Sequence, residues 1–162
     1  MAIVNNVTRL LDSRKIKYTV YKLPNEKLGA QETAAYLGID PSLVYKTIVL
    51  SREKPKKPVL VVVPGTREVD LKLVAKALGE KKVTLPTERE AELVTGLQAG
   101  GISPLALINK GFTVLIDDSA QNFTEIHISG GQRGLNIKLG LYDLAALIKA
   151  RITQVSRPGF IV

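Results

Sequence analysis

The sequence predicts an α+β domain with a mostly self-closed sheet, and three observations lead to this class. Short apolar segments rich in β-branched residues, such as 44–50 and 59–63, are typical of strands. Segments with apolar residues at helical spacing, such as 70–78, are typical of helices. The two kinds follow each other without the regular alternation of a parallel α/β sheet, and no linker or repeat divides the chain. We therefore expect residues 1–162 to form one domain.

Five helices are predicted from apolar residues that recur at helical spacing. Asp70 and Thr87 are side chains that cap the first turn of a helix, and Gly38 and Gly79 stand where helices usually end. The predicted helices cover residues 3–14, 31–37, 70–78, 88–94 and 141–148.

Strands are predicted between these helices, at seven places. They cover residues 18–23, 44–50, 59–63, 82–85, 113–116, 125–128 and 135–139. The segment 52–58 carries lysines and two prolines, which predicts a solvent-exposed hairpin tip outside the sheet interior. Residues 152–162 are expected to form a C-terminal tail.

The composition excludes several kinds of site. The chain has no cysteine, which rules out disulfides, cysteine nucleophiles and thiolate metal sites, and it has one histidine, His127. We therefore expect no metal and no cofactor. No apolar run approaches the length of a membrane span, and the N-terminus lacks the pattern of a secretory signal, so a cytoplasmic location is expected.

Positive charge is concentrated in the first half of the chain. Residues 1–81 contain 15 Lys and Arg against 8 Asp and Glu, whereas residues 82–162 contain 8 against 7. This asymmetry is expected of a protein that meets a polyanion such as nucleic acid, although a lysine-rich soluble surface gives the same count.

Two glycine-rich segments stand out, Gly-Gly-Ile-Ser-Pro at 100–104 and Ser-Gly-Gly-Gln-Arg-Gly at 129–134. Glycine pairs permit unusual backbone angles and a close approach to a bound group. The two segments either floor one pocket with main chain or are simply tight turns between strands. Neither matches the glycine fingerprints of nucleotide-binding proteins.

Five segments, in this order, resemble the YbaK/EbsC family, free-standing relatives of the editing domain of bacterial prolyl-tRNA synthetases. They are residues 44–47, 70–79, 95–96, 100–104 and 129–134. The resemblance implies a mixed, curved, barrel-like sheet flanked by helices. It also implies an aminoacyl-tRNA deacylase, a carboxylic ester hydrolase, that acts on mischarged tRNA, with Cys-tRNA(Pro) as the first expected substrate and prolyl-tRNA synthetase as a possible partner.

By this resemblance, the expected catalytic residues are Lys46, Gly101 and Ile102. Lys46 places an ammonium group in the pocket for the tRNA 3′ end, and the main-chain N–H groups of Gly101 and Ile102 stabilise the developing oxyanion. In the cysteine-editing branch the thiol of the substrate itself is thought to be the nucleophile. The residues expected to bind substrate are Tyr21, Leu28, Gly100, Ser129, Gly130, Gly131, Arg133 and Asn136.

Each of these assignments has a plainer alternative. Lys46 could be a strand lysine that points to water, Tyr21 a core residue and Arg133 a turn residue. His127 is expected to be structural. The pair Asp117-Asp118 is expected to form a turn, because adjacent strand residues point to opposite faces.

The chain also departs from the family at four positions near the expected pocket. The family usually has Gly where this chain has Ala106, an aromatic residue at Leu28, often Asp at Asn136 and commonly Tyr at His127. These departures leave the edited amino acid open, with alanine or another small one behind cysteine. They also leave open an alternative function, a non-catalytic module that binds tRNA ends or a synthetase.

Overall fold

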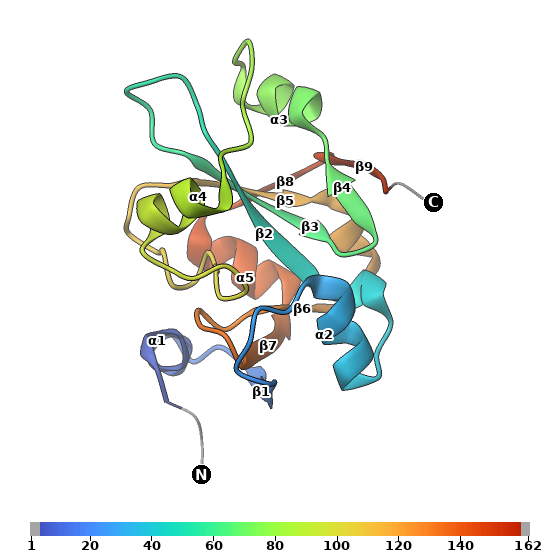
Figure 1. Cartoon of the computed structure of the whole chain (residues 1–162). Helices are drawn as coiled ribbons and strands as arrows, with labels where there is room; N and C mark the ends of the chain where they lie inside the picture. The colour runs from blue at the N-terminus through green and yellow to red at the C-terminus, as the bar shows by residue number, and fades with distance from the viewer. Residues whose placement is uncertain (1–3, 160–162) are drawn as a thin grey trace.

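The computed structural model describes residues 4–159 and has the predicted mixture of helices and strands (Figure 1). The elements are α1 (Asn6–Ser13), β1 (Tyr18–Lys22), α2 (Ala30–Leu37), η1 (Pro41–Leu43), β2 (Tyr45–Leu50), β3 (Val59–Pro64), β4 (Arg67–Val69), α3 (Leu71–Leu78), α4 (Glu88–Thr95), β5 (Thr113–Asp117), η2 (Asp118–Asn122), β6 (Glu125–Ser129), β7 (Leu135–Gly140), α5 (Leu141–Ile148), β8 (Arg151–Thr153) and β9 (Ser156–Pro158). The α+β class is confirmed.

The strands of the described residues form three hydrogen-bonded sheets, in the orders β2-β3-β5-β8, β1-β7-β6 and β4-β9. The four-stranded sheet is mixed, because β2 and β3 are antiparallel while β3, β5 and β8 run parallel. A single bridge between Val44 and His127 links β2 to β6. The sheet is therefore mixed and flanked by helices, but the described strands do not close into a barrel.

The helix ends form as predicted, since local capping groups specify them. The Asp70 side chain accepts a hydrogen bond from the Leu73 N–H at 3.0 Å and starts α3. Thr87 and Glu90 cap each other at the start of α4. Gly38 and Gly79 end α2 and α3 in the left-handed conformation.

The core lies on both faces of the four-stranded sheet. Leu60 and Val62 of β3 pack in the larger cluster with α5, whereas Val61 and Val63 pack in the smaller one with α3. Burial of each such side chain contributes about 1.5–3 kcal/mol. With β3 covered on both faces, β2 is held firmly at the sheet edge, where the site lies.

Two predictions about strands were wrong. Residues 82–85 do not form a strand: Thr84 makes an isolated bridge to Ser51, and Pro86, which has no amide hydrogen, follows. The expected C-terminal tail contains β8 and β9, which pair with β5 and β4. Ile3, in the first predicted helix, and residues 160–162 of the expected tail lie outside the described residues.

None of the helices in residues 4–159 has the length and apolar character needed to cross a membrane.

Candidate functional site

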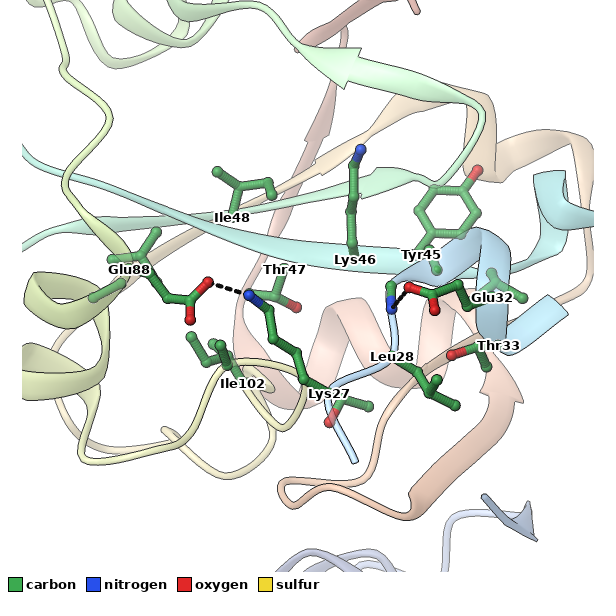
Figure 2. A pocket seen from close by; sticks show the side chains of 18 of the residues that line it. Lys27, Leu28, Glu32, Thr33, Tyr45, Lys46, Thr47, Ile48, Glu88 and Ile102 are labelled. Carbon is green, nitrogen blue, oxygen red and sulfur yellow. Dashed lines mark hydrogen bonds and ion pairs between the residues drawn. The ribbon is translucent and has the colours of Figure 1, made fainter. Parts of the chain in front are cut away.

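A cavity of about 480 Å³ lies along the edge of β2 that is not paired with β3. Figure 2 shows side chains from several segments around it. The lining is contributed by Leu23, by residues 27–30 and 32–33 around the start of α2, by Val44 and residues 45–49 of β2, by 85–88 and 91 around the start of α4, by 99, 100 and 102, and by 129, 135 and 136.

The open edge of β2 presents main-chain groups to this cavity. The Val44 carbonyl accepts a hydrogen bond from the Gly65 N–H at 2.9 Å, which makes Val44 and alternate residues along β2 the hydrogen-bonded partners of β3. Thr47 falls between them. Its N–H and C=O therefore point away from β3, to the side on which the cavity lies.

Lys46 and Thr47 occupy opposite faces of β2, as adjacent strand residues must. Figure 2 shows Lys46 and Ile48 rising from one side of the strand, whereas Thr47 lies towards Lys27 and Ile102. Lys46 is half-buried and lines the cavity. Burial lowers the pKa of its ammonium, an effect that the carboxylate of Glu68 partly offsets. In Figure 2 its ammonium points away from Lys27 and Ile102.

The two glycine-rich segments pack directly against each other. A Cβ atom added to Gly101 would lie 2.8 Å from the Cα of Gln132, a separation that real Cβ atoms essentially never show. Arg133 strengthens the contact, because its Nε donates a hydrogen bond of 2.7 Å to the Ala99 carbonyl. Gly100 has a φ of +89° and lines the cavity, so the first segment reaches the cavity through Gly100 and Ile102.

A hydrogen bond of the Gly101 amide argues against the role that we expected for it. The Gly101 N–H donates to the Gln98 carbonyl at 2.8 Å, so it is not free to stabilise an oxyanion. The N–H groups of Gly130 and Gly131 are also engaged, with the Leu135 carbonyl at 2.9 Å and the Ser129 hydroxyl at 3.2 Å. Gly101, Gly130, Gly131 and Arg133 support the lining residues without belonging to them.

Asn136 brings an amide group to the cavity wall. It is buried, and its Oδ1 lies 2.8 Å from the Nδ1 of His127, which donates to it. Among the described residues no buried side-chain nitrogen or oxygen lacks a partner. Asn136 is also one of the residues that line the cavity.

His127 and Tyr21 form the support behind Asn136 and do not line the cavity. His127 is buried, and this burial lowers the pKa of its imidazole. The Tyr21 ring lies against it, with 5.3 Å between ring centroids, and the Lys138 ammonium lies 5.9 Å from the Tyr21 centroid. Tyr21, which is only partly buried, thus packs on a buried histidine.

An ion pair between Lys27 and Glu88 spans two walls of the cavity (Figure 2). Lys27 precedes α2 and Glu88 begins α4, and both side chains are more than half exposed. This pair was not predicted from the sequence, because two charges 61 residues apart give no local signal. Leu28, beside Lys27, lines the cavity as expected.

Of the acidic pair Asp117-Asp118, Asp117 at the end of β5 has structural hydrogen bonds. Asp117 is buried and accepts hydrogen bonds from the Val155 N–H at 3.1 Å and the Ser119 N–H at 3.3 Å. Burial also raises the pKa of nearby Tyr45 to about 12, and the Tyr45 hydroxyl forms a hydrogen bond of 2.9 Å with Ser119 Oγ.

Across residues 4–159, no three His, Asp or Glu side chains gather to hold a metal ion.

Comparison with known proteins places this geometry in a family. Residues 25–147 match the family of the aminoacyl-tRNA editing domain. A protein of Enterococcus faecalis, named as a proposed Cys-tRNA(Pro)/Cys-tRNA(Cys) deacylase, EbsC, is 33% identical over 153 residues, which cover 93% of this chain and 92% of that protein. Proline–tRNA ligase of Aquifex aeolicus is 34% identical over 89 residues, 55% of this chain but only 15% of the ligase.

The fold recurs in a solved structure described as a proposed trans-editing enzyme for prolyl-tRNA synthetase. Its TM-score is 0.78 at 23% identity, over 96% of this chain and 99% of the other. At this identity the likeness establishes the fold alone, whereas the family match spans well over half of the sequence. The chain belongs to the aminoacyl-tRNA editing domain family.

Proposed function

We propose that this protein hydrolyses the ester bond of mischarged aminoacyl-tRNA, with Cys-tRNA(Pro) as its first expected substrate. The observation that carries the proposal is the cavity between the open edge of β2 and the Gly100–Ile102 loop, in a chain of the editing family. The name of the Enterococcus faecalis relative, which aligns over nearly the whole chain, supports the choice of substrate.

The reaction suits a cavity that offers hydrogen-bond donors. An aminoacyl ester is already activated, so its hydrolysis depends on positioning and on stabilisation of the oxyanion more than on a strong base. We assign the oxyanion donors to the main-chain N–H of Thr47 or Ile102, in place of the engaged Gly101 amide. If water is the nucleophile, it attacks the acyl carbon, the ester bond to the ribose oxygen breaks, the proton lost by the water passes to that oxygen, and the amino acid is released directly. If the thiol of a cysteinyl substrate is the nucleophile, its proton passes to the departing ribose oxygen, and water then hydrolyses the resulting cyclic thioester to free cysteine.

We assign Lys46 to the terminal nucleotide of the tRNA. Its ammonium lies on the other face of β2 from Thr47, so it suits a phosphate or ribose at the cavity margin better than the ester carbonyl (Figure 2). A compact ammonium on a flexible stem is a common partner of phosphate groups. Ser129 of β6 and Asn136 of β7 then border the aminoacyl group.

The segment before residue 25, outside the range of the family match, belongs to the same unit in this proposal. Val7 and Leu11 of α1 are buried in the larger core cluster, and Asn5 Nδ2 donates a hydrogen bond of 3.0 Å to the Gly130 carbonyl. Action on tRNA implies a cytoplasmic location and is compatible with docking on prolyl-tRNA synthetase.

A panel of mischarged tRNAs tests the proposal. Cys-tRNA(Pro), Ala-tRNA(Pro) and correctly charged Pro-tRNA(Pro) are incubated with the protein, and the loss of the labelled amino acid is followed. We expect cysteine to be released fastest and proline to be retained. Binding of uncharged tRNA(Pro) is measured in parallel, since binding without release from any member of the panel would establish the non-catalytic alternative instead.

A further inference from the structure

The hairpin between β2 and β3 and the loop between α3 and α4 form one continuous surface. Ser51 and Thr84 exchange main-chain hydrogen bonds of 2.8 and 3.0 Å. The Nε of Arg52 lies 2.7 Å from the Glu80 carboxylate, and the Lys56 ammonium lies 3.1 Å from it. Figure 1 shows the teal hairpin and the green loop extending beyond the sheet in the same direction.

This surface is strongly positive. We define the hairpin patch as Arg52, Lys54, Lys56, Lys57, Lys81 and Lys82. The segments 52–57 and 80–82 contain these six cations against two carboxylates, Glu53 and Glu80, a net +4 in a chain whose total is +8.

The arrangement of the carboxylates leaves most of this charge free. The Glu80 side chain is only 7% exposed and is shared by Arg52 and Lys56, and the hydrogen bond from Arg52 lowers its pKa. The charge of Glu80 is thus already paired with Arg52 and Lys56. Lys54, Lys81 and Lys82 are exposed and make no ion pair within residues 4–159.

The hairpin patch also begins where the cavity ends. Residues 45–49 of β2 line the cavity and lead into the hairpin. Residues 85–88 also line the cavity and begin three residues after Lys82. At about 3.4 Å per strand residue, the cations begin roughly 15–25 Å from Thr47. A nucleic acid strand carries a phosphate about every 3.4 Å along a duplex axis, so an RNA with its end in the cavity has several phosphates within this range.

We propose that the hairpin patch binds the phosphate backbone of the RNA whose 3′ end occupies the cavity. This inference rests on the proposed function and adds a second contact surface to it. Lysines bind phosphates without reading bases, so the patch supplies affinity and orientation, while selectivity for the aminoacyl group stays with the cavity.

Two triple variants with the same change of charge test this inference. The patch variant is Lys54→Ala, Lys81→Ala, Lys82→Ala. The control variant is Arg14→Ala, Lys17→Ala, Lys22→Ala. All six side chains are exposed, and none makes a hydrogen bond or ion pair within the described residues. The control removes three charges from β1 and from the connection between α1 and β1.

Each protein is given two substrates, full-length Cys-tRNA(Pro) and a cysteinyl ester of adenosine that fills the cavity but does not reach the hairpin. For the tRNA, we expect kcat/KM of the patch variant to be about tenfold lower at low salt. The slope of log kcat/KM against the logarithm of the salt concentration should become shallower by roughly 2 to 3, as expected for three lost phosphate contacts. Hydrolysis of the short ester stays unchanged, and the control variant behaves as wild type with both substrates.

Equal losses on the short ester and on tRNA, or equal losses in the two triple variants, would overturn the inference. Binding of uncharged tRNA(Pro), followed by fluorescence anisotropy, separates this failure from that of the proposed function. If the wild type hydrolyses neither substrate, the deacylase assignment fails, and weaker tRNA binding by the patch variant alone still supports the patch. Unchanged tRNA binding by that variant refutes it.

Discussion

The α-carbon of Gln132 lies against Gly101 so closely that a Cβ atom at position 101 would approach it to 2.8 Å. This contact joins two glycine segments about thirty residues apart in the sequence. We infer that it holds Gly100 and Ile102 in position to line the cavity together with β2. The shape of the cavity therefore depends on a residue that does not line it.

Gly101→Ala is expected to move the two turns apart and to destabilise the protein by roughly 1–3 kcal/mol, as overpacking of a close contact does. The matched control is Gly96→Ala, where φ is +72° and no atom would meet the added Cβ, so that the left-handed conformation alone costs roughly 1–2 kcal/mol. Urea denaturation and a deacylation assay check both variants. We expect a loss of activity in Gly101→Ala only, and equal activities would show that the glycine contact does not shape the site.

The ion pair between Lys27 and Glu88 is expected to act on substrate binding rather than on stability. Both side chains are more than half exposed, so breaking the pair changes the free energy of unfolding by at most about 1 kcal/mol. Lys27→Ala and Glu88→Ala should each alter KM, because each removes the ion pair that connects two walls of the cavity. The exchanged variant Lys27→Glu, Glu88→Lys restores the pair, and its KM should return towards that of wild type. A KM that follows the charge of one position alone would argue against a joint role.

His127 should remain neutral at pH 7 and titrate below the ordinary histidine value, because burial lowers its pKa. The unfolded chain takes up the proton near pH 6.5, whereas the native protein resists it, so the unfolded state binds more protons as the pH falls. The free energy of unfolding is thus expected to decrease below pH 6.5, by at most about 1.4 kcal/mol per pH unit from this group. His127 is the only histidine, so its imidazole protons report the native pKa directly in an NMR titration. A native pKa at or above 6.5 would contradict this account.

Asn136→Asp is expected to change the pKa of His127 in the opposite direction. A carboxylate in place of the amide still accepts from His127 Nδ1 at the 2.8 Å contact, and it favours the charged imidazolium. The His127 pKa should rise above its wild-type value, and the loss of stability below pH 6.5 should shrink. The same substitution replaces an amide by a carboxylate in a residue that lines the cavity, so the relative rates on Cys-tRNA(Pro) and Ala-tRNA(Pro) should change. Unchanged titration in the variant would show that the two side chains are not coupled.

The parts of the fold that the sequence predicted are those with local signals. Asp70, Thr87 and the helix-ending glycines act within one turn of their own segments, so α3 and α4 were predicted nearly to the residue. The three-residue strands β8 and β9 were missed, because what makes them strands is pairing with β5 and β4, far away in the chain.

The candidate site divides in the same way. A cavity next to the glycine-rich segments was predicted from their composition and their likeness to a family, and Leu28, Lys46, Gly100 and Ser129 do line one cavity. The sequence did not reveal that the Gly101 amide is already bonded to Gln98. It also did not reveal that Thr47, rather than Lys46, faces the glycine loop, because register and face are fixed only when β2 pairs with β3.

In the proposed function, the cavity beside β2 receives the aminoacylated end of a tRNA, and the ester is hydrolysed there. The most direct measurement is single-turnover deacylation of Cys-tRNA(Pro) by wild type, by Lys46→Ala and by the exposed-lysine control Lys17→Ala. Loss of one charge-assisted contact predicts a rate about 10- to 100-fold lower for Lys46→Ala, with Lys17→Ala equal to wild type. A Lys46→Ala rate that matches wild type would contradict the placement of the tRNA end in this cavity.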